Sequence, residues 1–236
     1  MSRPNILWVV IDALRYDRVG CNGCERPISP TIDALADRGR RFTTAISQSG
    51  WSLPSYATML TGLYPCEHGM QKMSNTLSSE IPTLPEHLQK AGYTTICVTG
   101  NPYVQKHFNL ARGFDKYIHH APYLTNTRQH EHFSDWAMPD LQRRLRKWGG
   151  AVGLCDKGGA MIANDVERLV QEAQEPWFLY VNLMEVHDPY FPPWGYVPGF
   201  ASGMSARASA LLRHVLNFGG HGRITNPRYF GGNVNA

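Results

Sequence analysis

The sequence lacks a long apolar run, a cysteine framework and a marked excess of charge of either sign. The apolar run nearest the N-terminus, 6–11, is far shorter than the roughly 20 residues that span a bilayer, and no leader pattern precedes it. Five cysteines are too few for a disulfide scaffold, and an odd number cannot pair completely. The net charge of +4 is too small to indicate nucleic acid as a partner. We therefore expect a cytoplasmic protein that binds neither a membrane nor nucleic acid.

The pattern that is present alternates strand signals with helix signals. With 42% hydrophobic and 18% charged residues, the composition is typical of a globular domain. Continuous β-rich runs predict buried strands, and apolar residues at helical spacing between capping residues predict helices. Strands are expected at 6–11, 42–49, 93–99 and 177–183, and helices at 30–39, 54–62, 84–92 and 162–173. This alternation predicts an α/β fold with a mainly parallel sheet.

Two segments carry more specific expectations. In the helix at 30–39, the side chains of Ile32, Leu35 and Ala36 should form the apolar face. The segment 121–157 has few strand signals, so we expect it to be an insertion or a cap within one domain that covers 1–236.

Polar residues follow three of the predicted strands. The first strand ends in Asp12, the strand at 93–99 is followed by Asn101, and the strand at 177–183 is followed by His187. Ligands of open α/β sheets bind beyond the carboxyl ends of the strands, so these three side chains could converge on one site. The alternative is that they serve only as caps and turn residues.

Ser52 lies just before the helix at 54–62. A hydroxyl group there is close to free backbone N–H groups and the positive end of a helix dipole, which stabilise an anionic ester oxygen. A hydroxyl nucleophile needs a base or a metal to activate it, and Asp12 is the first candidate for holding that metal. Oxygen ligands of this kind suit Ca²⁺ or Mg²⁺ better than zinc. The alternative is that Ser52 is an ordinary N-cap.

Several short stretches together resemble the N-terminal portion of the sulfatase family, within the alkaline phosphatase-like superfamily. The resemblance implies an alkaline phosphatase-like three-layer sandwich with a mainly parallel central sheet, and a small anionic ester as substrate. The stretches that carry it are 3–7, 11–12, 29–39, 51–65, 67–69, 92–93, 112–115 and 187–190.

The resemblance also implies roles for individual residues. Asp12 matches a metal-ligand aspartate, and the metal would be Ca²⁺, with Mg²⁺ or Mn²⁺ as alternatives. Ser52 matches the nucleophile, which sulfatases oxidise to formylglycine. His187 matches a histidine that contacts the sulfate group or the leaving oxygen. Asn101 falls where many sulfatases carry a substrate-binding lysine.

The sequence departs from the family pattern at three places. The family often has paired aspartates at the first metal site, whereas here Ala13 follows Asp12. In the family's nucleophile motif C/S-x-P-x-R, the arginine position is occupied by Tyr56, which favours direct attack by an unmodified Ser52. The family's second metal-binding turn, Asp-His-Gly or Asp-Asn-Gly, has no counterpart, since Gly220 precedes the His221-Gly222 pair. We therefore expect a sheet that is incomplete at the C-terminus.

Three functional hypotheses follow from these residues. The first is a metal-dependent sulfuric ester hydrolase with Ser52 at the nucleophile position. The second is a phosphate or phosphonate ester hydrolase or transferase that uses unmodified Ser52. The third is a non-catalytic fragment that lacks the second metal-binding segment.

Overall fold

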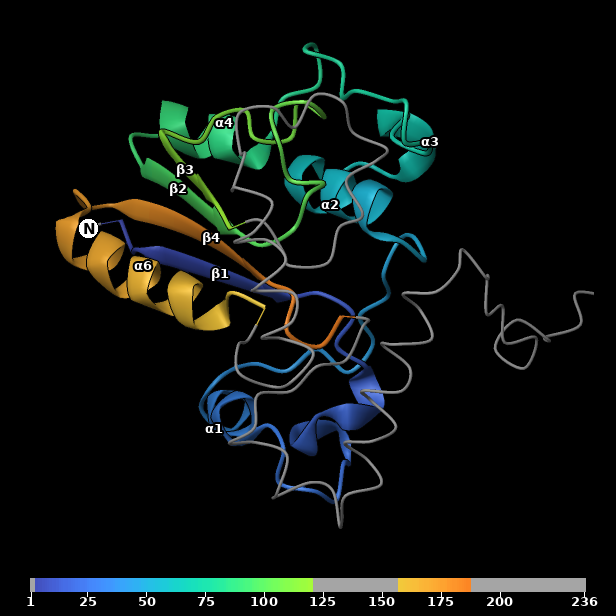
Figure 1. Cartoon of the computed structure of the whole chain (residues 1–236), viewed down its shortest axis with the longest axis vertical. Helices are drawn as coiled ribbons and strands as arrows, with labels where there is room; N and C mark the ends of the chain where they lie inside the picture. The colour runs from blue at the N-terminus through green and yellow to red at the C-terminus, as the bar shows by residue number, and fades with distance from the viewer. Residues whose placement is uncertain (1–2, 121–156, 188–236) are drawn as a thin grey trace, which may run out of the picture.

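The structure is a computed structural model that describes residues 3–120 and 157–187. Within these residues, four strands form one sheet in the order β1-β4-β2-β3, and every neighbouring pair is parallel (Figure 1). The elements are β1 (Ile6–Ile11), η1 (Tyr16–Arg18), η2 (Gly20–Asn22), α1 (Pro30–Arg38), α2 (Ser52–Thr61), α3 (Pro65–His68), α4 (Leu84–Lys90), β2 (Thr94–Thr99), β3 (Lys116–His119), α6 (Gly159–Glu172) and β4 (Trp177–Leu183).

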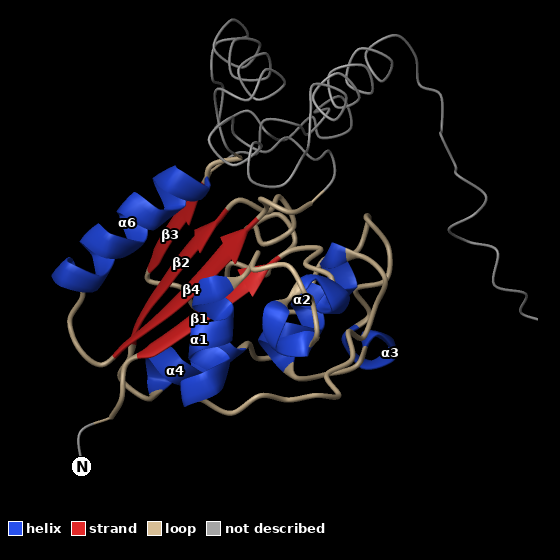
Figure 2. Cartoon of the chain, turned by 90° about the horizontal axis from the view of Figure 1, so that it is seen from below, coloured by secondary structure: helices blue, strands red, loops and turns tan. Residues whose placement is uncertain are grey.

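Helices cover both faces of the sheet, which gives three layers. Figure 2 shows α6 on one side of the strands and α2 and α4 on the other. The apolar side chains of β2 and β4 alternate between two clusters, one beneath each helical layer. The cluster beneath α6 contains Ile96, Val98, Ile162, Leu169, Leu179 and Val181, and the cluster beneath α2 includes Leu53, Tyr56, Leu60, Cys97, Phe178 and Tyr180.

The position of each strand in the sheet explains its burial. The central strands β2 and β4 bury nearly all their side chains, as their sequences rich in β-branched and aromatic residues predict for a parallel sheet. Along β1, which has one strand neighbour among the described residues, Leu7 and Val9 remain about half exposed. Because β4 lies between β1 and β2, the loops after β1 and β2 leave on either side of its carboxyl end.

The structure confirms most of the predicted elements. The strands expected at 6–11, 93–99 and 177–183 are β1, β2 and β4, and the expected helices are α1, α2, α4 and α6. The Thr83 side chain accepts a hydrogen bond from the Glu86 backbone N–H, and the Glu86 carboxylate accepts one from the Thr83 backbone N–H. This reciprocal capping box fixes the start of α4.

One expected strand is absent, and one expected helix packs away from the sheet. The segment 42–49 contains no strand, and Phe42 and Ile46 are 74% and 76% exposed. Its β-rich composition is not enough, because a strand also needs a neighbour to pair with. In α1 no residue is buried and Leu35 is 59% exposed, because this helix packs against η2 rather than the sheet.

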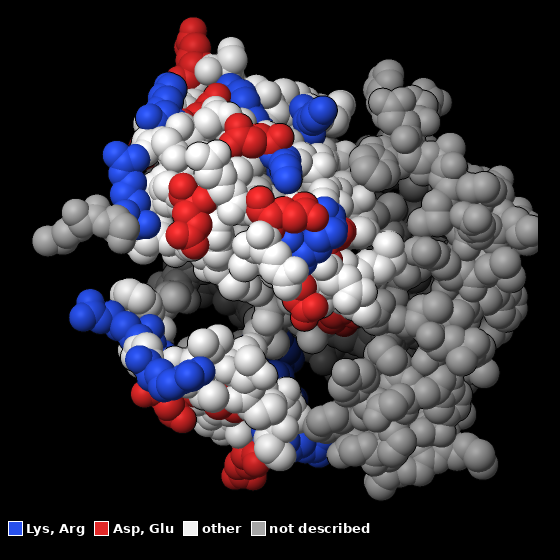
Figure 3. Space-filling model, turned by 90° about the vertical axis from the view of Figure 1, so that its left-hand side faces the viewer, with Lys and Arg blue, Asp and Glu red and all other residues white. Residues whose placement is uncertain are grey.

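Three further expectations concern the surface charge, membrane helices and the segment 121–157. Figure 3 shows Lys and Arg side chains interspersed with Asp and Glu over the face in view, so the small net charge is not gathered there. In the described ranges, no helix combines the length and the apolar character that crossing a bilayer requires. Residues 121–156 of the segment 121–157 lie outside the described residues.

Candidate active site

The parallel sheet brings the loops after β1 and β2 to the same edge. The backbone N–H of Asp12 donates to the Leu183 carbonyl at 2.9 Å, which extends the β1–β4 ladder by one residue. On the other side of β4, the backbone N–H of Gly100 donates to the Asn182 carbonyl at 3.1 Å. These two hydrogen bonds place Asp12 and Asn101 on either side of the carboxyl end of β4.

Three side chains donate hydrogen bonds to a single oxygen of Asp12. The donors to Oδ2 are Ser52 Oγ at 3.2 Å, Tyr56 Oη at 3.1 Å and Asn101 Nδ2 at 2.6 Å. Hydrogen bonds to an ionised carboxylate are stronger than those between neutral groups. Oδ1 of Asp12 accepts no hydrogen bond from the described residues. The carboxylate is therefore held through one oxygen, and its three donors are 40, 44 and 89 residues away in the sequence.

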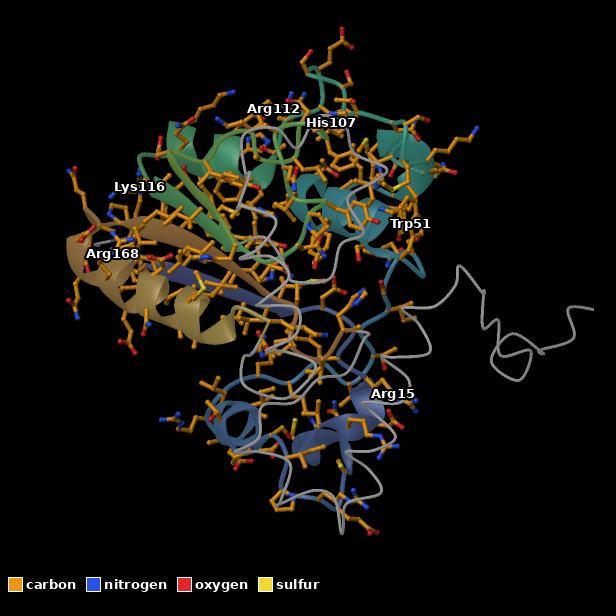
Figure 4. All side chains as sticks on the ribbon, viewed as in Figure 1. Arg15, Trp51, His107, Arg112, Lys116 and Arg168 are labelled. Carbon is orange, nitrogen blue, oxygen red and sulfur yellow. The ribbon has the colours of Figure 1, made fainter. Side chains whose placement is uncertain are left out.

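Ser52 is the first residue of α2, and its side chain does not cap the helix. Trp51 occupies the N-cap position, without a side-chain capping hydrogen bond. Figure 4 labels Trp51 just before α2, and its ring packs edge-on against Tyr103 with centroids 6.0 Å apart. Because the Ser52 hydroxyl turns to Asp12, the interpretation of Ser52 as an N-cap is wrong. The free N–H groups of the first turn of α2 lie beside this hydroxyl.

Tyr56 lies one turn after Ser52 on α2 and faces the same carboxylate. Its side chain is buried, and burial, followed by the negative charge of Asp12, raises the pKa of the phenol well above its ordinary value. The phenol is therefore a neutral donor at physiological pH. Sequence reasoning noted Tyr56 only as a replacement for an arginine and did not predict this contact.

Asn182 is a second residue that sequence reasoning missed. It is fully buried in β4, and its Nδ2 donates to Tyr56 Oη at 2.6 Å. The signal that could have found it is a single amide inside the apolar strand sequence Trp177–Leu183, because buried polar side chains in native proteins are hydrogen-bonded.

His187 does not take part in the hydrogen bonds that join Asp12, Ser52 and Asn101. It is the last described residue of the second range, its backbone N–H donates to the Met184 carbonyl at 3.1 Å, and the Lys157 ammonium donates to its carbonyl. The hydrogen bonds of the described residues thus join three of the four predicted site residues, Asp12, Ser52 and Asn101.

The described residues offer one candidate metal ligand, Asp12, rather than a metal site. They contain no group of three or more His, Cys, Asp or Glu side chains that could hold a metal ion. Asn101 turns its amide nitrogen to Asp12, and its Oδ1 accepts from the Tyr103 N–H at 2.8 Å, so it offers no oxygen at this point. Asp12 Oδ1 accepts no hydrogen bond from the described residues, but one carboxylate oxygen does not complete the coordination of Ca²⁺ or Mg²⁺.

The sequence as a whole matches a known family. The family model for sulfatases matches residues 4–219, which is most of the chain. The chain belongs to the sulfatase family. This finding confirms the resemblance carried by the short stretches around Asp12, Ser52 and His187.

Individual sulfatase relatives and solved structures agree with that assignment. An arylsulfatase of Clostridium perfringens is 26% identical over 220 residues, which cover 82% of this chain and 45% of the relative. The crystal structure of the phosphonate monoester hydrolase of Agrobacterium radiobacter matches with a TM-score of 0.65 at 22% identity, over 84% of this chain and 44% of that one. An alkaline phosphatase superfamily protein from Vibrio parahaemolyticus matches with a TM-score of 0.53 at 21% identity, over 92% and 50%.

These structural similarities confirm the predicted alkaline phosphatase-like α/β fold. The chain spans about half the length of the relatives and structures that it matches.

Proposed function

We propose that this sulfatase-family chain contributes the nucleophile side of an active site that hydrolyses sulfuric esters, with Ser52 as the attacking residue. The observation that carries the proposal is the hydrogen bond from Ser52 Oγ to Asp12 Oδ2 at the first turn of α2. It places a hydroxyl group, a carboxylate and free helix N–H groups at the carboxyl edge of a parallel sheet, where α/β proteins bind ligands.

The chain's own residues would share the chemistry as follows. Ser52 Oγ attacks the sulfur of the ester, the bond from sulfur to the leaving oxygen breaks, and the proton released by Ser52 ends on that oxygen. Water then attacks the sulfur of the sulfated Ser52, which releases hydrogen sulfate and restores the Ser52 hydroxyl. Asp12 orients the Ser52 hydroxyl by accepting its hydrogen bond, and the N–H groups at the start of α2 stabilise the anionic oxygens. We assign His187 to contact with the transferring group, as the family motif implies.

Asn101 has a different place in this proposal from the one expected from sequence. Its side chain is fully buried and its amide donates to Asp12 Oδ2. We therefore assign it to holding Asp12 in place rather than to contact with the substrate.

The family implies a divalent cation, which supplies positive charge to neutralise ester oxygens. We propose Ca²⁺, with Mg²⁺ or Mn²⁺ as alternatives, and Asp12 Oδ1 as its one ligand among the described residues. The remaining ligands must come from other parts of the protein, since the described residues do not complete the site.

A second candidate function is hydrolysis or transfer of a phosphate or phosphonate ester by unmodified Ser52. The observation that favours it is Tyr56, a neutral buried phenol at the position where the formylglycine motif has arginine. The third candidate, a non-catalytic fragment, is favoured by the single metal ligand of the described site.

Two measurements on the same preparation separate these functions. The mass of the peptide that contains Ser52 shows formylglycine as a loss of two hydrogens. Rates with an aryl sulfate and with the matching aryl phosphate, at several concentrations of Ca²⁺, rank the substrates. Faster sulfate hydrolysis supports the sulfatase proposal, faster phosphate hydrolysis with intact Ser52 supports the second candidate, and no hydrolysis of either ester contradicts both.

A further inference from the structure

A closed circuit of buried hydrogen bonds lies behind Asp12. It runs through Thr99 at the end of β2, Asn182 in β4, Tyr56 in α2 and Asn101 after β2, and we call these residues together with Asp12 the polar circuit. The links are Asn101 N to Thr99 Oγ1 at 3.0 Å, Thr99 Oγ1 to Asn182 Oδ1 at 3.4 Å, Asn182 Nδ2 to Tyr56 Oη at 2.6 Å, Tyr56 Oη to Asp12 Oδ2 at 3.1 Å and Asn101 Nδ2 to Asp12 Oδ2 at 2.6 Å.

In each hydrogen bond of the polar circuit, the neighbouring hydrogen bonds determine which atom donates and which accepts. Thr99 Oγ1 accepts from the Asn101 backbone N–H, so its own proton is available to the Asn182 carbonyl oxygen. With Oδ1 committed to that contact, the Asn182 amide nitrogen faces Tyr56. Because the phenol oxygen accepts this hydrogen bond, its single proton is directed at Asp12.

Because these side chains are buried, the donor and the acceptor of a hydrogen bond cannot easily be exchanged. Thr99, Asn101 and Asn182 are fully buried and Tyr56 is 2% exposed. Water therefore cannot replace a lost partner, and reversing one link would leave a buried donor or acceptor unpaired. The buried side chains of Tyr56 and Asn101 therefore fix the orientation of Asp12 Oδ2, which accepts the hydrogen bond from Ser52.

We propose that Thr99 and Asn182 are positioning residues for the reaction: acting through Tyr56, they hold Asp12 Oδ2 in the orientation that receives the Ser52 hydroxyl. The catalytic part of this inference rests on the proposed function, in which Ser52 is the nucleophile. Neither residue touches the substrate. The family motif has a cationic arginine at the position of Tyr56. In this chain the neutral groups of the polar circuit orient the Asp12 carboxylate, so no positive charge is added beside Ser52.

A matched pair of threonines in β2 provides the test. Thr99→Val removes the hydroxyl that sets the circuit, while Thr95→Val removes an equally buried hydroxyl near the opposite end of the strand, where it donates to Gly113 and Asp115. Thr99→Ser retains the hydroxyl. The readouts are the side-chain amide signals of Asn101 and Asn182 in ¹H–¹⁵N NMR spectra, and kcat and KM with the ester that the wild-type protein hydrolyses.

The proposal expects Thr99→Val to shift both amide signals and to lower kcat by about tenfold, the size of one lost hydrogen bond, with KM unchanged. Thr99→Ser should restore both properties, and Thr95→Val should leave both unchanged. If Thr99→Val does not fold, Asn182→Asp keeps the volume but replaces the donor to Tyr56 by an acceptor, so the same shift of the Asn101 signal and a fall in kcat are expected.

Three results would overturn the proposal: unchanged amide signals in Thr99→Val, shifted signals with kcat within about twofold of wild type, or an equal fall of kcat in Thr95→Val, which marks a general loss of packing. A wild-type protein without esterase activity would instead refute the proposed function and the catalytic role assigned to the circuit. The amide signals would then still decide whether the circuit orients Asn101 and Asn182.

Discussion

Two buried tyrosines allow the energetic role of the polar circuit to be measured directly. Tyr56 and Tyr180 are 2% and 0% exposed and belong to the same apolar cluster. The Tyr56 hydroxyl donates to Asp12 and accepts from Asn182, whereas the buried Tyr180 hydroxyl has no hydrogen-bond partner among the described residues. Removing each hydroxyl by a Tyr→Phe substitution changes the same atom in nearly the same surroundings.

The expected magnitudes differ in size and sign. Tyr56→Phe removes a hydrogen bond to a charged group, worth about 1.5–3 kcal/mol, and deprives Asn182 Nδ2 of its close acceptor. The Asn182 amide retains only the Val10 carbonyl at 3.5 Å. We therefore expect the free energy of unfolding to fall by about 3 kcal/mol. Tyr180→Phe removes an unpaired buried hydroxyl, so we expect no loss and a gain of up to about 1 kcal/mol.

Equilibrium unfolding in urea measures both variants, with the slope of the free energy against urea concentration as a check that the two-state comparison holds. The account requires Tyr56→Phe to be the less stable variant by about 3 kcal/mol or more. Equal stabilities, or a larger loss in Tyr180→Phe, would refute the assignment of the Tyr56 hydroxyl to a structural hydrogen-bond circuit.

Three further predictions concern stability elsewhere in the fold. Burial lowers the pKa of His119 to about 4, so as the pH falls the unfolded chain binds a proton before the folded protein does. The free energy of unfolding, measured by urea unfolding at each pH, should therefore fall by about 3 kcal/mol between pH 6.5 and pH 4. His119→Gln should make the free energy of unfolding depend less on pH over this range. Gly113→Ala should destabilise the fold by more than Gly23→Ala, because both glycines have positive φ but only at Gly113 would the added Cβ meet the backbone of Glu86; thermal unfolding compares them, and equal losses would contradict the close approach. Thr83→Ala should cost about 1 kcal/mol through loss of the cap of α4, again by urea unfolding, and an unchanged midpoint would show that this cap contributes nothing.

The main elements of the fold could be predicted from sequence because their signals are local. β2 and β4 are rich in β-branched and aromatic residues, which suits strands whose two faces are both covered by helices. The capping box of α4 and the glycine that ends α2 are defined by residues within one turn of the helix. The segment 42–49 has the same composition as a strand, and what it lacks is a partner strand, which no local pattern reveals.

The candidate site divides in a similar way. Asp12 and Asn101 could be placed near each other because both follow parallel strands. Ser52 could be assigned to the same site because it lies at the start of a helix and because the sequence resembles sulfatases. The contacts of Tyr56 and Asn182 could not be predicted, because they depend on the distance and angle between α2 and β4. A sequence pattern gives the residues on each element but not how closely two elements pack.

The central claim is that Ser52 is the nucleophile of a sulfuric ester hydrolase, and its most direct test is the hydrolysis rate of an aryl sulfate by Ser52→Ala against a matched control. Ser55→Ala removes a hydroxyl three residues along α2 that donates only to the backbone of Ser49 and Trp51 and contacts the Ser47 hydroxyl. The account predicts measurable wild-type hydrolysis, a loss of at least about 1000-fold in Ser52→Ala, and no more than about a twofold change in Ser55→Ala, because surface changes away from the site have small effects. A Ser52→Ala protein that hydrolyses the ester at the wild-type rate, or a wild-type protein that does not hydrolyse it, would contradict the claim.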